Sequence, residues 1–208
     1  MNFKYIGQDM VRPDAISKVT GKSVFLDDVR LPGMLHAAIL RPPRAHALIK
    51  SIDTTEAEQM DGVVKVVTGQ GCQFRYGDNI ADLVPMAIDR VRYIGEPVAA
   101  VIADTPAHAQ AAVEKIKVEY EPLPVYIDAR QAMSEDAVLI HPDMENIWHL
   151  PTLRPIVGTN IASVYQVKKG DGEEGFAEAD VVIEHEFDYP LGSSAALEAD
   201  RDVRHGLD

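Results

Sequence analysis

The sequence has very little cysteine, a minority of basic residues and no long hydrophobic run. Its one cysteine, Cys72, excludes an internal disulfide, a zinc site built from cysteines and an iron–sulfur cluster held by this chain alone. The longest apolar run, residues 98–103, is far shorter than the ~20 residues of a membrane span. Residues 1–10 also lack the apolar core of a signal peptide, so we expect a cytoplasmic protein.

Acidic side chains outnumber basic ones, with 33 Asp and Glu against 20 Lys and Arg, which gives a net charge of −13. A general nucleic-acid binder carries a basic face, so this balance argues against that class. The 208 residues, 46% of them hydrophobic, correspond to one or two domains at roughly 150 residues per domain. The chain is therefore long enough to form a sizeable core.

Short strands are predicted where apolar and β-branched residues cluster between Gly, Pro and Asp turn signals. These strands cover residues 35–40, 47–52, 63–67, 91–93, 97–103 and 118–120. Between them the sequence predicts a short helix at 55–60 and a longer one at 106–115, with Thr105 as its N-cap. This alternation suggests two β-α-β units in an α+β fold with mixed sheets.

After residue 128 the pattern weakens. A helical turn is predicted at 128–133, a linker or extended arm at 134–160, a strand at 161–167, a short helix at 173–179 and an edge strand at 181–187.

Two glycine-containing motifs resemble phosphate-binding loops but fail their spacing rules. Before Gly21-Lys22-Ser23, the position of the first P-loop glycine holds Ile16. After Gly69-Gln70-Gly71, the third glycine of a dinucleotide fingerprint is replaced by Phe74. We interpret both as ordinary surface segments.

Cys72 and the histidines are further candidates for chemistry. Cys72 lacks a recognisable base, although Arg75 could lower its pKa, so we expect an inert thiol. No two histidines have metal-ligand spacing with a supporting carboxylate, which leaves only a site built from distant residues. The seven are His36, His46, His108, His141, His149, His185 and His205.

Glu96 precedes the most apolar predicted strand. A carboxylate there could act as an acid or base, or could anchor a turn or interface by pairing with Arg92 or another chain. We favour the anchoring role. These patterns therefore identify no catalytic, cofactor-binding or metal-binding residue. The alternative that would involve such a residue is an independent small enzyme that uses Cys72 or Glu96.

Several short sequence motifs, in a consistent order, resemble the N-terminal part of the molybdenum-binding subunit of the xanthine dehydrogenase/aldehyde oxidase family. They occur at residues 12–21, 31–36, 41–47, 52–53, 62–63, 91–99, 103–105 and 118–124. The longest is Val91-Arg92-Tyr93-Ile94-Gly95-Glu96-Pro97-Val98-Ala99.

The resemblance implies an α/β hammerhead domain over residues 1–128 and a linker over 129–160. Residues 161–208 then resemble the incomplete start of a molybdopterin-binding domain, through Gly170-Asp171 and the phrases at 176–180 and 181–187.

The resemblance also implies a chemistry. Family members hydroxylate an aldehyde or an N-heterocycle with a molybdenum–molybdopterin centre and a glutamate base, and pass electrons through 2Fe-2S clusters, usually to FAD. The family's cofactor-contacting loops and base glutamate lie further along a longer subunit, so we transfer none of these residues here. Cys72 alone cannot hold a cluster, so the iron–sulfur centres would belong to a partner.

The last residues depart from the family pattern. Leu197-Glu198 is followed by a charged stretch, residues 199–208. Family members continue into an apolar strand at this point. The difference suggests a truncated, frameshifted or artificially bounded polypeptide. We expect a structural and assembly role, with no catalysis by the isolated chain. The alternative is a standalone interaction module that assembles with separately encoded iron–sulfur and molybdopterin subunits.

Overall fold

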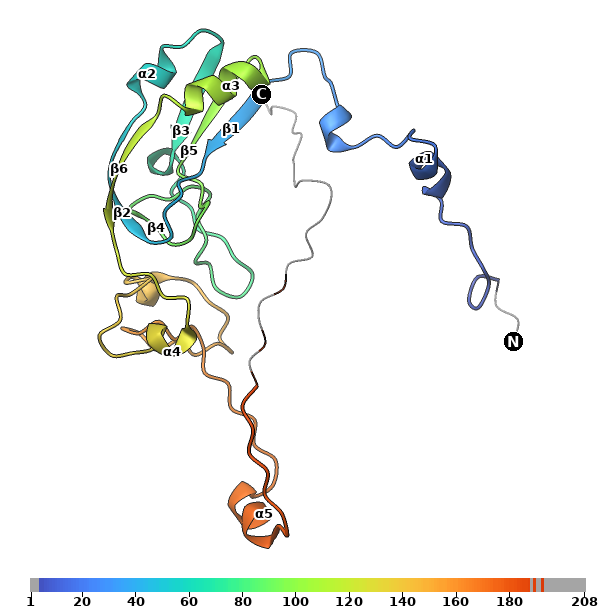
Figure 1. The fold of residues 1–208 in the computed structure, drawn as a ribbon, viewed down its shortest axis with the longest axis vertical. Helices are drawn as coiled ribbons and strands as arrows, with labels where there is room; N and C mark the ends of the chain where they lie inside the picture. The colour runs from blue at the N-terminus through green and yellow to red at the C-terminus, as the bar shows by residue number, and fades with distance from the viewer. Residues whose placement is uncertain (1–3, 188, 190–191, 193–208) are drawn as a thin grey trace. The chain divides into compact units, whose positions relative to one another are not determined.

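The computed structural model describes residues 4–187, 189 and 192 (Figure 1). These residues divide into two units, which are considered separately. The larger unit is Gly33–Asp180, and the smaller consists of the described parts of Met1–Pro32 and Val181–Asp208. The charged stretch at 199–208 lies outside the described residues.

The first sheet of the larger unit has the strand order β1-β5-β3, with both pairs antiparallel. Its members are β1 (His36–Leu40), β5 (Ala99–Ala103) and β3 (Val63–Thr68). The central strand β5 is the apolar run seen in the sequence, and Ala99, Val101 and Ala103 have no exposed surface. A strand with neighbours on both sides and a helix above it has to be apolar, which explains the composition of this run.

Helix α3 (Pro106–Val113) covers one face of this sheet, and α2 (Thr55–Glu58) lies beside it (Figure 1). The apolar stripe predicted for the longer helix is buried, as expected from its helical spacing. It packs on side chains of β1, β3 and β5 to form one hydrophobic core. The stripe consists of Ala109, Ala112, Val113 and Ile116.

The second sheet has the order β4-β2-β6 and is also antiparallel. It contains β4 (Arg90–Val91), β2 (Ala47–Asp53) and β6 (Lys117–Pro122). Ile52 and Val118 from this sheet contact the core under α3 as well as a second core, so the two sheets share a continuous interior.

The predicted β-α-β units and mixed sheets are wrong. Strands β2 and β3 flank α2 but belong to different sheets, as do β5 and β6 on either side of α3, and every strand pair is antiparallel. A parallel crossover needs about a dozen or more residues, and α2 has four. The short helix is therefore too short to join β2 and β3 as parallel neighbours, and it carries the chain from one sheet to the other.

The strands predicted at 161–167 and 181–187 are also wrong, because the structure assigns no strand to these described residues. A strand requires a neighbour to satisfy its backbone groups. Val181 and Ile183 are 74% and 84% exposed, so this apolar stretch does not form part of a core within the described residues. The helix predicted between them is present as α5 (Gly172–Glu178).

The remaining elements are short. One short helix is α1 (Ala15–Val19), and the helical turn predicted at 128–133 is α4 (Ala129–Ala132). The described residues also contain the 3-10 helices η1 (Leu26–Asp28), η2 (Gly69–Gly71) and η3 (Met144–Asn146).

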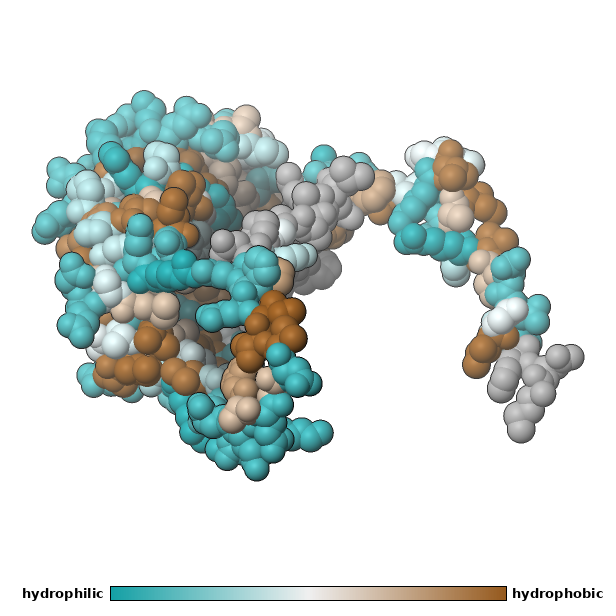
Figure 2. All heavy atoms as spheres, turned by 60° about the horizontal axis from the view of Figure 1, so that its bottom comes forward, coloured by the Kyte–Doolittle hydropathy of each residue, from teal (hydrophilic) through white to brown (hydrophobic). Residues whose placement is uncertain are grey.

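Large apolar side chains remain at the surface of the larger unit, interspersed with hydrophilic ones (Figure 2). Among the most exposed are Ile94, Ile127, Tyr165 and Val167. None of the helices in the described residues is long and apolar enough to cross a membrane.

Thr105 caps the N-terminus of α3. The amide of His108 donates to Thr105 Oγ1 at 3.2 Å, and Pro106 occupies the first helical position. Replacement of Thr105 by Ala should lower the free energy of unfolding by about 1 kcal/mol, because loss of the cap leaves an amide unsatisfied. Urea unfolding followed by circular dichroism measures this. Thr105→Ser keeps the hydroxyl and should stay close to wild type; an equal loss in both variants would argue against the cap.

Candidate functional site: a buried Arg–Glu pair and the segment it holds

Glu96 lies in the turn between β4 and β5 and is only 4% exposed. Its Oε2 accepts a 2.5 Å hydrogen bond from the amide of Arg92, and its Oε1 lies 3.8 Å from Arg92 Nη1. On the outer side of the same turn, Arg41 donates to the carbonyl of Gly95 at 2.6 Å. The sequence left two partners open for Glu96, Arg92 or another chain, and the structure pairs it with Arg92.

Arg92 is the centre of this arrangement, with a side chain only 9% exposed. Its guanidinium donates to the carbonyls of Arg90 and Ile140 and lies 3.6 Å from the Asp89 carboxylate. Burial raises the pKa of Glu96 and lowers the pKa of Arg92, and the attraction between the two groups opposes both shifts. Each buried charge thus depends on the other for compensation.

A buried carboxylate with a raised pKa is a common feature of acid–base catalysts. Here, however, both oxygens of Glu96 are directed at Arg92. A general acid or base must reach the proton that it transfers, whereas both Glu96 oxygens here contact the same residue. The geometry therefore favours the anchoring role, and the absence of a catalytic role stays a prediction.

The arginines also fix a segment that is distant in sequence, which we call the docked segment (residues 139–150). Arg90 and Arg92 donate to the carbonyls of Leu139 and Ile140 at 3.1 and 3.2 Å. Arg75 forms a 2.5 Å ion pair with Asp143. These contacts attach residues from the predicted linker directly to the rest of the larger unit.

Backbone pairing and apolar burial complete the attachment. The amide of Ala81 donates to the carbonyl of Trp148, and the amide of Leu150 donates to the carbonyl of Asn79. Met144 and Ile147 are 8% and 3% exposed. Sequence patterns did not indicate this attachment, because the apolar residues of the segment have neither helical nor alternating spacing.

Asn160, which follows the docked segment in the chain, forms hydrogen bonds with it and with α4. Its Oδ1 accepts from the amide of Ile140, and its Nδ2 donates to the carbonyls of Ala132 and Val138. One side chain thus joins α4, the docked segment and the following stretch. No motif surrounds Asn160, so only the tertiary contacts reveal its role.

The other candidates are placed apart from this cluster. Cys72 directly follows η2 and is partly exposed. Gly69-Gln70-Gly71 is η2 itself, and the amides of Lys22 and Ser23 donate to the carbonyl of Ser17, so neither motif forms a phosphate cradle.

Five of the histidines have a side-chain contact. His46 Nδ1 lies 2.7 Å from the Pro124 carbonyl, His108 Nδ1 lies 2.6 Å from Asp104, and the ring of His185 contacts Phe187. His149 lies 3.0 Å from the Leu150 carbonyl, and His141 belongs to the docked segment. His36 is in β1, and His205 is outside the described residues. Within the described part of the chain, no three His, Cys, Asp or Glu side chains form a group that could hold a metal ion.

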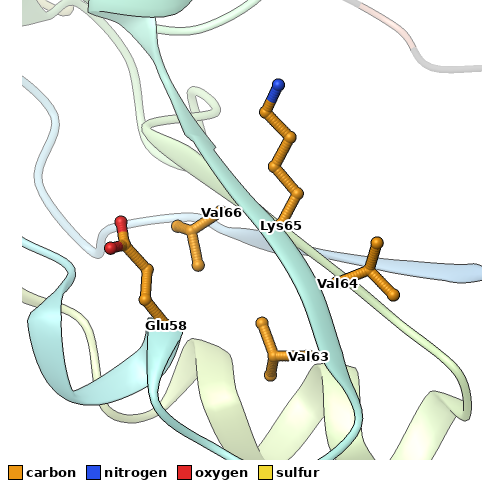
Figure 3. Close-up of a pocket in the computed structure, with 5 residues that line it drawn as sticks. All are labelled: Glu58, Val63, Val64, Lys65 and Val66. Atoms are coloured by element: carbon orange, nitrogen blue, oxygen red, sulfur yellow. The ribbon is translucent and has the colours of Figure 1, made fainter.

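A shallow groove of about 300 Å³ runs beside β3 and is lined by Glu58 and residues 63–66 (Figure 3). Val63 and Val66 project on the same side of the strand as Glu58, whereas Val64 and Lys65 project on the other. The pairing of β3 with β5 shifts register between Val63 and Lys65, and such a bulge places two consecutive side chains on one face.

The fold and these contacts define a two-sheet antiparallel α+β domain, and comparison with known proteins identifies it. A family described as "Aldehyde oxidase and xanthine dehydrogenase, a/b hammerhead domain" matches residues 20–124, about half of the chain. The chain therefore belongs to this family, and the predicted fold class and resemblance are confirmed.

Individual relatives agree. The chain is 37% identical over 195 residues to a probable xanthine dehydrogenase subunit of Bacillus subtilis, an alignment that covers 93% of this chain and 24% of that one. It is 30% identical to the nicotinate dehydrogenase large molybdopterin subunit of Eubacterium barkeri, covering 98% and 45%. The aldehyde oxidoreductase structure from Desulfovibrio gigas superposes with a TM-score of 0.62 at 34% identity, covering 82% of this chain and 19% of that one. The chain thus spans less than half the length of these relatives.

The β3 groove does not fit a molybdopterin cofactor. Three of its five lining residues are valines, and the only charged groups are Glu58 and Lys65, which project from opposite sides of the strand. A charged pterin requires several polar groups that converge on it.

Proposed function

We propose that this chain is the N-terminal portion of the large subunit of a molybdenum-dependent hydroxylase that oxidises an aldehyde or an N-heterocycle, and that its own role is structural. The observation that carries the proposal is the hammerhead match at residues 20–124 in a chain that spans 24% of a xanthine dehydrogenase subunit. The buried Arg92–Glu96 pair fits this role because it fixes the shape of a turn and of the docked segment.

In this proposal, residues 1–128 form the hammerhead domain, 129–160 connect it onward and 161–208 begin a molybdopterin-binding domain. The exposed Val181, Ile183 and Phe187 support the last assignment, since an apolar stretch of this kind requires a covering surface. The chain itself contributes no catalytic, cofactor-binding or metal-binding residue.

The names of two relatives support a proposal about cofactors and partners. One relative is named a large molybdopterin subunit and another a subunit of a xanthine dehydrogenase, so we propose that this chain works within a cytoplasmic complex. The complex would contain the remaining molybdopterin-binding domains and an iron–sulfur subunit or domain with 2Fe-2S clusters, together with FAD. No nucleic acid or membrane takes part.

The experiment is a metal and activity assay on the purified chain. Elemental analysis should find no stoichiometric molybdenum, and dye reduction with an aldehyde or a purine should show no turnover above a blank. Co-expression with an iron–sulfur subunit and the remaining molybdopterin-binding domains should give a complex that retains this chain through gel filtration. Stoichiometric molybdenum with turnover by the isolated chain would contradict the proposal, and so would failure to join the complex.

A further inference from the structure

His141 occupies an unusual position in the docked segment, because its side chain is 16% exposed and one ring nitrogen is fully enclosed. Nδ1 is buried without a hydrogen-bond partner, whereas Nε2 faces Asp82 at 3.8 Å. In a neutral imidazole only one nitrogen carries a proton. A proton on Nε2 leaves just a lone pair at the enclosed Nδ1, which is the less costly arrangement.

Protonation of this ring would place an N–H group at Nδ1, where no acceptor is available. Leaving such a donor unsatisfied costs far more than a typical hydrogen bond contributes. The charges that face the ring do not offset this cost. Arg92 and Arg75 oppose a further positive charge, while Asp82 and Asp143 favour it, and Asp143 is already paired with Arg75.

The enclosed Nδ1 cannot be hydrated while the segment is attached in this arrangement. The two preceding carbonyls, of Leu139 and Ile140, are held by Arg90 and Arg92, and the carbonyl of His141 accepts from the amide of Met144 at the start of η3. Hydration of a charged ring is therefore linked to detachment of the segment. We propose that protonation of His141 releases the docked segment from the rest of the larger unit, so that its attachment depends on pH.

The direction of the effect follows from linkage. Burial, followed by the charge of Arg92, lowers the pKa of His141 in the attached state, whereas the detached ring titrates near the ordinary value of about 6.5. The stabilising contribution is therefore fully present above that value and is lost as the pH falls through it toward the lower, attached-state pKa. Over this window the opening equilibrium increases by at most about tenfold per pH unit, the limit for one proton.

Amide hydrogen exchange on the full chain, read by mass spectrometry between about pH 7.5 and 5.5, tests the proposal. Once corrected for the pH dependence of intrinsic exchange, protection of residues 139–150 should fall below about pH 6.5 while protection of β5 stays constant. Trp148, the chain's single tryptophan, lies within the segment, so its fluorescence gives a second readout.

His141→Gln is the decisive variant, because it retains a neutral donor toward Asp82 and cannot be protonated. The fall in its protection across this range should be clearly smaller than in the wild type. Glu96 also has a shifted pKa, but it is present in both proteins, so its effect cancels in the comparison. Asp82→Asn removes a favourable charge and should enlarge the loss of protection across the same pH range. Flat protection in the wild type, or the same fall in His141→Gln, would overturn the proposal.

Discussion

Replacement of Arg92 by Met should lower the free energy of unfolding by about 3 kcal/mol, since removal of one partner from a buried ion pair leaves the other charge uncompensated. Glu96 would keep only its bond from the residue 92 amide, and the carbonyls of Arg90 and Ile140 would lose a donor. The expected loss is limited because Glu96 can take up a proton once its partner is gone. Urea denaturation at neutral pH measures the change.

Glu96→Gln is the matched control for this variant. It removes the negative charge but keeps an acceptor for the Arg92 amide, and Arg92 retains Asp89 at 3.6 Å. Its cost should be smaller, about 1 kcal/mol, the net value of one hydrogen bond. The double variant should be less destabilised than the sum of the two singles, which shows the coupling directly. A loss below about 1 kcal/mol for Arg92→Met would mean that the pair does not stabilise the fold.

Replacement of Gly77 by Ala should destabilise the hairpin at residues 76–83 by about 3 kcal/mol, because two penalties act together. Gly77 has a φ of 146°, and a Cβ there would lie 1.9 Å from the backbone oxygen of Ile80. Backbone atoms cannot rotate away as a side chain can, so the hairpin itself must shift. Ile80 and Ala81 pair with the docked segment, so increased exposure of Trp148 should accompany the loss.

Gly95→Ala separates the two penalties. Gly95 has a φ of 85°, but no atom lies within 4 Å of the place that a Cβ would occupy, so only the conformational cost of about 1 kcal/mol applies. Thermal and urea unfolding of both variants, together with Trp148 fluorescence, make the comparison. Equal losses in the two variants would show that the hairpin adjusts freely around residue 77.

Local patterns predicted the secondary structure wherever one face of an element is buried against a near neighbour. The α3 stripe and its Thr105 cap were identified because helical spacing and capping chemistry depend on residues a few positions apart. The apolar composition of β5 likewise indicated a covered strand. The division into two sheets could not be predicted in the same way, because pairing β2 with β6 joins residues about 70 positions apart.

The candidate functional site could also be predicted only in part, because most of its contacts join residues that are distant in the sequence. The sequence offered Arg92 as one of two partners for Glu96 because the two are four positions apart, and the structure selected it. Arg75, His141 and Asn160 carried no signal, since their contacts reach 20 to 68 positions along the chain. The boundaries of the hammerhead domain and the absence of a catalytic residue remain predictions.

By itself, the sequence determined the family, the α+β class and the positions of the main strands and of α3, because ordered phrases and short-range periodicity are properties of the linear chain. Only the tertiary structure decided which strands pair, that residues 139–150 dock on the rest of the larger unit, and that the Glu96 carboxylate is directed at Arg92. These features depend on desolvation and on contacts between distant residues, which form only when the chain is folded.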